Sequence, residues 1–116
     1  MGYFAIQTKV EDAAKRGRNS KRVSANSVYV KTENGYGLKL HDTVIVDFKN
    51  DRTIVLNTNG WKTVTTKRHM NDALPNGFVV SQVKGQWFLN VYDYATGNKL
   101  AKILFEDGLV IETDSL

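Results

Sequence analysis

A segment of twelve residues, Gly60 to Asn71, gathers side chains that could contact a ligand or do chemistry. It holds one indole, three threonine hydroxyls, three cations and an imidazole: Trp61, Thr63, Thr65, Thr66, Lys62, Lys67, Arg68 and His69. Exposed polar and aromatic groups cluster where a protein meets a partner. The segment matches no catalytic or metal-binding spacing, so it predicts a binding surface.

Two interpretations of this segment stay open. Trp61 is either a core lid at the start of a strand, with its N–H bonded to a carbonyl, or an exposed platform for a nucleic-acid base. In the second interpretation Lys62, Lys67 and Arg68 contact phosphates. Thr66 either caps a helix or bonds a phosphate oxygen beside the free N–H groups of the helix start.

A basic tract lies near the N-terminus, with five cations and no acid in eight residues. Its cations are Lys15, Arg16, Arg18, Lys21 and Arg22. Such a tract attracts a phosphate backbone, or it forms a solvated, mobile loop that aids solubility. The net charge is +4, and residues 1–40 contribute +5 of it, whereas residues 76–116 contribute −2. The charge is therefore unevenly distributed along the chain, with most of the positive charge in the N-terminal third.

The chain has few histidine or cysteine side chains that could act as metal ligands or in catalysis. There is no cysteine, and the two histidines, His41 and His69, have no zinc-ligand spacing. His69 and Asp72 could share a helix face as a base and its orienting acid, with a Ser or Thr nucleophile, but such pairs are usually surface contacts. We expect no enzyme activity, no catalytic residue, no metal and no cofactor.

Length and composition predict one domain, residues 1–116, with a basic N-terminal segment, residues 1–26, that is partly mobile. A chain of 116 residues with 41% hydrophobic residues suffices for one modest core. No apolar run approaches the roughly 18 residues of a membrane span. The start, Met1 to Gln7, lacks the features of a secretory signal. These observations predict a soluble intracellular protein with no membrane partner.

Turn signals at short intervals separate runs of β-branched and aromatic residues. We predict strands over Ser27–Thr32, Gly37–His41, Thr43–Phe48, Arg52–Asn57, Phe78–Val83, Gln86–Tyr92, Lys99–Phe105 and Leu109–Thr113. The predicted fold class is α+β and β-rich, a small curled antiparallel sheet or partly open barrel of about seven strands with one or two short helices. The last strand is expected at a sheet edge guarded by acidic residues, where two copies could associate.

Two helices are predicted. One covers about Val10 to Arg16 and stops at Gly17. The other covers about Thr65 to Leu74, with Thr65 or Thr66 as N-cap, and docks Met70, Ala73 and Leu74 on the sheet.

The run from Gln86 to Tyr94 alternates as a central strand. Trp87, Leu89 and Val91 share one face, while Phe88 and Tyr92 lie on the other with Asn90. This second face is predicted either beneath a helix or as a partner-binding patch.

Several of these segments resemble small proteins of tailed bacteriophages. The pattern comprises Leu40-His41, Thr43 to Val46, Thr53 to Asn57, Gly60 to Lys67 with Asn71, and Val83 to Phe88. The resemblance covers about residues 38–90. Its core reads G-W-x-T-x-T-T-K, within the relatives' longer pattern G-W-x-T-x-T-T-K-x-R-x-N. The chain departs from it at Asn59, where a second glycine is frequent, and at Arg68-His69-Met70. The resemblance implies a viral accessory role in the cytoplasm of an infected bacterium and carries over no catalytic residue.

Three functional hypotheses follow. In the first, the chain binds DNA or RNA through the five cations of the basic tract together with Trp61, Lys62, Thr66, Lys67 and Arg68. In the second, it is a non-catalytic inhibitor of a host enzyme or bacterial immune system, a role in host takeover or counter-defence. The third and weaker hypothesis is a small structural component of the virion, associating through strand edges.

Overall fold

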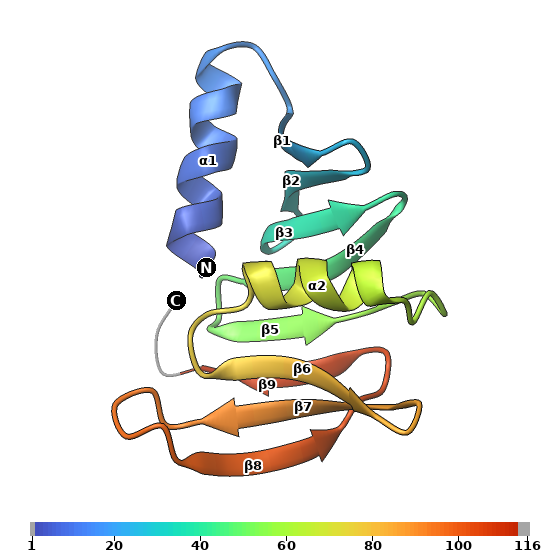
Figure 1. Cartoon of the computed structure of the whole chain (residues 1–116). Coiled ribbons are helices and arrows are strands. Elements are labelled where there is room, and N and C mark those ends of the chain that lie inside the picture. The colour runs from blue at the N-terminus through green and yellow to red at the C-terminus, as the bar shows by residue number, and fades with distance from the viewer. Residues whose placement is uncertain (1, 114–116) are drawn as a thin grey trace.

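The computed structural model describes residues 2–113 of the chain. Two helices and nine strands follow one another as Figure 1 shows. In chain order these are α1 (Tyr3–Lys15), β1 (Ser20–Ser24), β2 (Ser27–Thr32), β3 (Gly35–Leu40), β4 (Thr43–Lys49), β5 (Thr53–Leu56), α2 (Val64–Ala73), β6 (Phe78–Val83), β7 (Gln86–Tyr92), β8 (Lys99–Leu104) and β9 (Leu109–Glu112).

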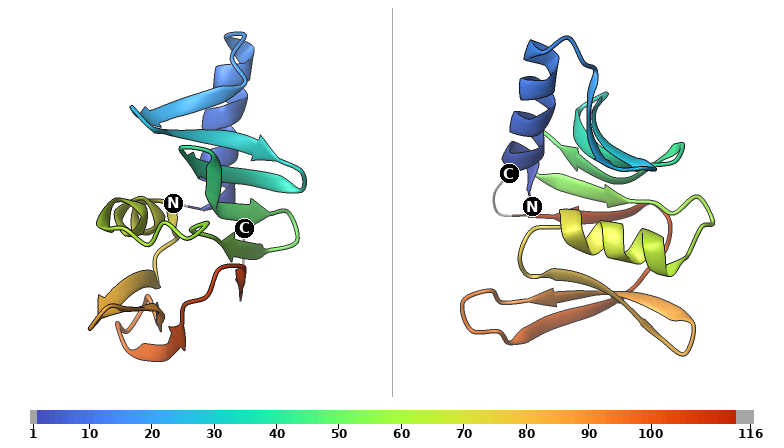
Figure 2. Two further views of the ribbon diagram at one scale, coloured as in Figure 1. Left: turned by 90° about the vertical axis from the view of Figure 1, so that its right-hand side faces the viewer. Right: turned by 45° about the horizontal axis from the view of Figure 1, so that its top comes forward.

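The strands form two antiparallel sheets. One has six strands in the order β1-β2-β3-β4-β5-β9, and the other has three in the order β6-β7-β8. Figure 2 shows α2 against the six-stranded sheet, with the three-stranded sheet beyond it. The β-rich α+β class is confirmed, but there are more strands than the predicted seven, and the described strands form two open sheets instead of a barrel. The predicted edge position of β9 is also confirmed.

Helix α1 forms because Ile6, Val10 and Ala13 repeat at helical spacing and are buried on one face. This face packs against β1, β2 and β3, where the Tyr36 hydroxyl donates a hydrogen bond to Glu11 at 3.3 Å. The prediction of Val10 to Arg16 was too short. Its start was missed because Gly2, at the N-cap, offers no capping side chain that would mark the helix end.

Helix α2 begins at Val64, one residue earlier than predicted. Thr63 is its N-cap, and the Thr63 hydroxyl oxygen accepts a hydrogen bond from the Thr66 backbone N–H at 3.2 Å. The prediction of Thr65 or Thr66 as the N-cap was therefore wrong. The predicted docking face is confirmed, because Met70, Ala73 and Leu74 are all buried.

One contiguous core joins α1, α2 and both sheets. Trp87 is fully buried, and its ring lies edge-on to Phe105 with the centroids 5.5 Å apart. Leu89 is buried on the same face of β7. The interpretation of β7 as a central strand with one face in the core is thus confirmed.

Two glycines allow β3 to lie very close to β4. A Cβ on Gly37 would stand 2.7 Å from the Val46 carbonyl oxygen and 2.8 Å from a Val44 methyl group, and one on Gly35 would meet the Phe48 carbonyl. A β-bulge interrupts the β3–β4 pairing between Leu38 and Lys39. Glycine at such points permits a tight bend in a sheet, so this part of the sheet curls strongly.

Neither helix of the described chain is long and apolar enough to span a bilayer.

Candidate nucleic-acid interface

The basic tract is folded into a corner between α1 and β1. Gly17 takes a left-handed conformation, with φ 78°, and the Arg18 N–H donates to the Ala13 carbonyl at 3.0 Å, which ends the helix. Lys15 and Arg16 lie at the C-terminal end of α1, where cations favour the negative end of the helix dipole. These two side chains therefore also help to stabilise the helix.

Strand β1 was not predicted, because its sequence Ser-Lys-Arg-Val-Ser lacks a run of apolar residues and its side chains are mostly exposed. It is an edge strand paired with β2. The structure gives this segment a strand over Ser20–Ser24, and the partial mobility of residues 1–26 stays a prediction. Pairing with β2 fixes where the basic side chains point, and this determines which of them can act together.

Strand register places Arg22 and Lys39 on one face of the sheet. Arg22 pairs with Val28, and Val28 pairs with Lys39, so the three residues form one row across β1, β2 and β3. Lys21 is adjacent to Arg22 along the strand and therefore points to the opposite face. The basic tract is thus divided between two faces.

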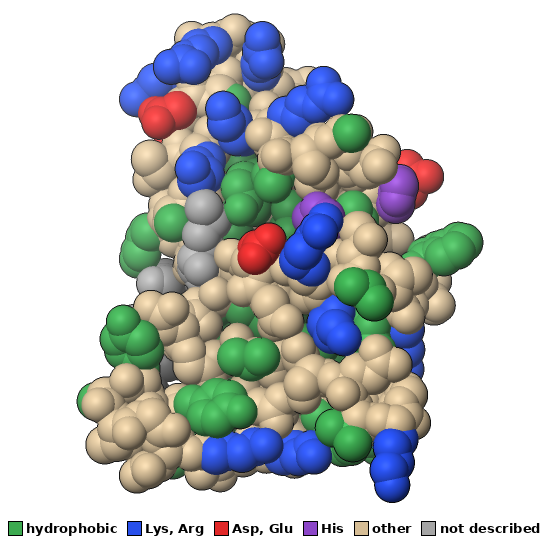
Figure 3. All heavy atoms as spheres, viewed as in Figure 1, with side chains coloured by type: hydrophobic (Ala, Val, Ile, Leu, Met, Phe, Trp, Pro, Cys, Tyr) green, Lys and Arg blue, Asp and Glu red, His purple; other side chains and the backbone are tan. Residues whose placement is uncertain are grey.

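Arg18, Arg22 and Lys39 line an open groove of about 860 Å³ over this face, which we call the basic groove. Figure 3 shows Lys and Arg side chains gathered at the end of the molecule formed by α1 and β1. The remaining lining residues are small or polar, apart from Val28: Asn19, Ser20, Ser24, Ala25, Asn26, Ser27, His41 and Asp42.

The cations of the basic groove are free of ion pairs within residues 2–113. The two salt bridges there are Lys15–Asp12, at 3.9 Å and exposed, and Lys49–Asp47, at 2.9 Å. The Arg22 Nε group donates to the Ser24 carbonyl oxygen at 3.2 Å, which holds the side chain along β1. Asp42 is the single carboxylate in the lining, so the groove carries a net positive charge.

The second predicted surface is a loop, residues 57–63, held by a carboxylate far away in the sequence. Asp107 accepts hydrogen bonds from the Thr58 backbone N–H at 2.7 Å, from the Thr58 hydroxyl at 2.8 Å and from the Gly60 N–H at 3.4 Å. Burial raises the pKa of Asp107, but these hydrogen bonds and the charge of Lys62 outweigh it and leave the pKa below its usual value.

Sequence reasoning missed this role of Asp107 and treated it as an acidic guard of the last strand. The signal was absent because the contact depends on the pairing of β5 with β9, which aligns Leu56 with Leu109. The turn residues around Thr58 do not indicate which acid faces it.

Trp61 extends from this loop with 68% of its surface exposed. The core-lid interpretation was therefore wrong, and so was its placement at the start of a strand. Lys62 and Arg68 are exposed nearby in the chain, and Lys67 donates to the Gln82 side chain at 3.4 Å. These groups are accessible to a ligand.

Thr66, in contrast, is buried, and its hydroxyl lies 3.1 Å from the Thr63 hydroxyl within the helix cap. Its hydroxyl oxygen does not face solvent, so the predicted contact of Thr66 with a ligand is not accessible. The His69 Nδ1 atom lies 2.8 Å from the Thr65 carbonyl oxygen and donates to it. His69 is thus oriented by the Thr65 carbonyl, one turn earlier in α2.

The basic groove and the Trp61 loop lie at the same end of the six-stranded sheet. The antiparallel order places the β1–β2 turn, the β3–β4 turn and the loop after β5 together at one end, as the right-hand side of Figure 1 shows. Strands β1 and β5 are four strand spacings apart, about 19 Å. The two regions therefore lie at one end of the sheet, with β2, β3 and β4 between β1 and β5.

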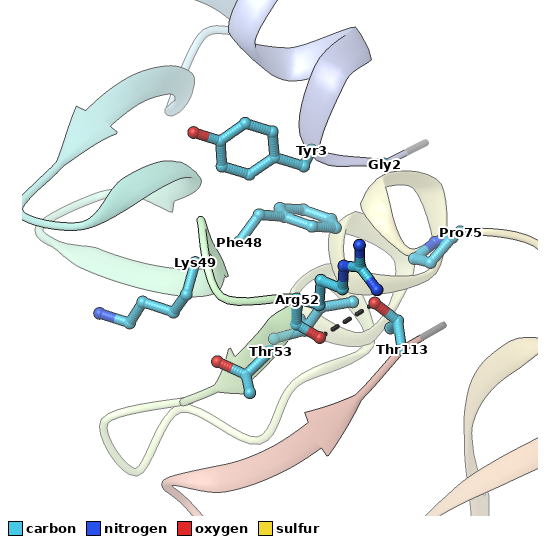
Figure 4. Close-up of a pocket in the computed structure, with 9 residues that line it drawn as sticks. Gly2, Tyr3, Phe48, Lys49, Arg52, Thr53, Pro75 and Thr113 are labelled. Atoms are coloured by element: carbon cyan, nitrogen blue, oxygen red, sulfur yellow. Dashed lines mark hydrogen bonds between the residues drawn. The ribbon is translucent and has the colours of Figure 1, made fainter. Parts of the chain in front are cut away.

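A smaller cavity of about 70 Å³ lies elsewhere, between the start of α1 and the β4–β5 turn. Figure 4 shows Tyr3 and Phe48 above it, with Arg52 beside Pro75 and the Thr113 hydroxyl donating to the Arg52 carbonyl at 3.0 Å. This volume corresponds to about two water molecules, so the cavity is too small for a nucleotide.

Among residues 2–113 no group of three or more His, Asp or Glu side chains is placed to hold a metal ion.

Residues 4–112 match the model of a family described as Kyanoviridae Gp96 protein. The match runs from α1 to the end of β9, well beyond residues 38–90. It therefore includes the basic tract, which lay outside the resemblance seen in the sequence. No curated protein and no solved structure matches the chain.

Proposed function

Because the chain belongs to the Kyanoviridae Gp96 protein family, a family of phage proteins, we propose that it is a phage accessory protein that binds nucleic acid through the basic groove. A phage protein works in the host cell or in the virion, and we place this one in the host bacterial cytoplasm. It acts by binding DNA or RNA, without catalysis and without a cofactor.

The observation that carries the proposal is the concentration of Arg18, Arg22 and Lys39 around one open groove without neutralising ion pairs. Phosphate backbones bind such surfaces by releasing their condensed counterions. If the chain makes three phosphate contacts with a duplex, raising the salt from about 50 to about 200 mM should lower its affinity about 40-fold. The exposed Lys62, next to Trp61 in the chain, and the exposed Arg68 of α2 offer further cations.

Fluorescence anisotropy of labelled single-stranded and duplex DNA and RNA, at these two salt concentrations, tests the proposal. The variant Arg18→Gln/Arg22→Gln removes two groove cations, and we expect it to lower the salt slope by about 2. The matched control, Lys9→Gln/Lys31→Gln, removes the same charge from two cations that do not line the groove.

The control is expected to keep most of the affinity and the slope of the wild-type chain. Equal losses in both double variants would mean that net charge, and not the basic groove, attracts the polymer. A wild-type chain that binds no nucleic acid at the lower salt concentration would overturn the proposed function.

A host protein is the second candidate partner, as expected of an inhibitor of a host enzyme or immune system. The observation that favours it is an open groove of about 660 Å³ between the three-stranded sheet and β9, to which Leu100, Ile103 and Val110 contribute. Leu100 is 65% exposed and Val110 is 56% exposed. Such apolar surface is typical of protein interfaces.

This alternative predicts a stoichiometric complex in host lysate that Leu100→Asp/Val110→Asp abolishes and Arg18→Gln/Arg22→Gln leaves intact. A structural role in the virion is weaker and rests on the open edges of β1, β8 and β9. It predicts self-association of the pure chain, which sedimentation measures directly.

A further inference from the structure

The three-stranded sheet has an outer face, opposite the buried Trp87 and Leu89, that carries two aromatic rings. Phe88 lies on this face because strand residues alternate between the two sides. Tyr92 follows a register shift in the pairing of β7 with β8, and its ring lies on the side of Lys99. Both side chains are partly exposed. The neighbouring strand β8 adds Lys102, which pairs with Asn90, and Lys99, which pairs with Tyr92.

No helix among the described residues covers this face. Helix α2 contacts the three-stranded sheet along β6, its edge away from β8. Figure 3 looks onto the surface of this sheet, where hydrophobic side chains are bordered by Lys and Arg over β8, with further Lys and Arg over α2. The face therefore presents two partly exposed rings on either side of the buried Asn90, with lysines at its margin.

The lysines lie close to the rings. The Lys102 Nζ atom is 4.3 Å from the centroid of the Phe88 ring, and the Lys99 Nζ atom is 5.9 Å from the centroid of the Tyr92 ring. Each ammonium group occupies the ring face that a planar ligand would take. A flexible lysine stem lets the ammonium group move aside while its charge stays next to that ligand.

We propose that this outer face stacks the unpaired bases of a single-stranded nucleic acid on Phe88 and Tyr92, while Lys99 and Lys102 move from the rings to its phosphates. The inference rests on the proposed function and narrows its ligand to single strands. Bases in a duplex already stack on each other, so their faces cannot reach side chains on a sheet, whereas unpaired bases can.

The charge of this face favours a polyanion over an apolar protein partner. Its aromatic surface is flanked by two cations, and Lys102 and Lys99 have no carboxylate within salt-bridge distance among residues 2–113. Phe88 and Tyr92 are four residues apart on a strand, so their Cα atoms are about 13 Å apart, a spacing that suits two bases that are not adjacent. This spacing tolerates many sequences, because every base has a face that can stack.

The test uses the full chain and two labelled probes, an oligodeoxythymidine of about 15 nucleotides and a hairpin duplex. The variant Phe88→Leu/Tyr92→Leu keeps apolar side chains and removes both rings. We expect it to lose affinity for the single strand at least about 10-fold and to change duplex affinity by less than about 2-fold.

The matched control is Leu104→Ala, which removes exposed apolar surface from the residue that pairs with Phe88. It should change single-strand affinity by less than about 2-fold. An equal loss in the control would overturn stacking in favour of general hydrophobic contact. Unchanged single-strand binding in the double variant would also overturn it.

Crosslinking keeps the proposal testable if the double variant does not fold. Wild-type chain is irradiated with a single strand that contains 4-thiothymidine, and the crosslinked peptide is identified. Attachment within β7 supports the platform, and attachment only around Arg18 and Arg22 overturns it while leaving the proposed function intact. If the wild-type chain binds neither probe, the proposed function fails as well.

Discussion

Asp107 receives two hydrogen bonds from Thr58, one from the backbone N–H at 2.7 Å and one from the hydroxyl at 2.8 Å. Thr58 is buried, whereas Asp107 lies on the exposed loop between β8 and β9. A single carboxylate thus satisfies two donors at the base of the loop that presents Trp61. Fixing this loop limits the orientations of the exposed indole.

Replacing Asp107 with Ala should destabilise the chain by about 1–2 kcal/mol, because the buried Thr58 hydroxyl loses its charged acceptor. The loss of stability is smaller than for a buried hydrogen bond to a charged group, since solvent reaches the carboxylate. Urea denaturation measures it. Glu106→Ala, next to it in the same loop, is the control and should have little effect, and equal losses in both would contradict the anchoring role of Asp107.

Acid should weaken the fold through the same contact. The pKa of Asp107 is lowered in the folded state, so its contribution to stability is present above the ordinary aspartate pKa of about 4 and is lost as pH falls through the lower folded value. The pKa of Asp51 is lowered too, by its hydrogen bonds with Thr53, which adds a loss in the same direction. Unfolding free energy measured from about pH 5 downward should fall less steeply in Asp107→Asn than in the wild type.

Gly37→Ala should destabilise the chain by about 1–3 kcal/mol, through crowding against the Val46 carbonyl and Val44. Gly37 is not among the residues with positive φ, so the cost comes from lack of space and not from backbone strain. Val44→Ala in the same chain removes one of the two crowded groups and should recover part of the loss. Thermal unfolding of the single and double variants measures this coupling, and strict additivity would contradict it.

Thr63→Ala should cost about 1 kcal/mol of stability by removing the N-cap of α2. Thr63→Ser retains the hydroxyl oxygen that accepts from the Thr66 N–H and should lose much less. Thr65→Ala is the matched control in the first turn, because its side chain is exposed. Chemical denaturation measures the unfolding free energy of each variant. A larger loss of stability in Thr65→Ala than in Thr63→Ala would indicate that Thr65 is the N-cap.

Trp61→Ala should leave stability within about 0.5 kcal/mol, since most of the indole surface is already in solvent. The same variant should weaken nucleic-acid binding if the indole meets the polymer beside Lys62 and Arg68. Denaturation and anisotropy on one preparation separate the two effects. A large loss of stability would restore a core role for the ring.

Local pattern was enough to predict much of the secondary structure. The bounds of β2, β6 and β7 agree with the prediction, because alternation of apolar and polar side chains and flanking turn residues are read within a few positions. The docking face of α2 was predicted for the same reason, since Met70 and Ala73 lie three residues apart on a helix. The frequent turn signals between β-branched and aromatic runs also indicated correctly a β-rich fold.

Long-range pairing decided what local pattern left open. Strand β1 exists because β2 offers it a partner, and its register, not its composition, assigns Arg22 to the basic groove and Lys21 to the other face. Asp107 reaches Thr58 only through the pairing of β5 with β9. The sequence by itself determined which segments extend or coil, since those preferences act between near neighbours. The tertiary structure decided which charges and rings share a surface, because that depends on contacts between residues far apart in the chain.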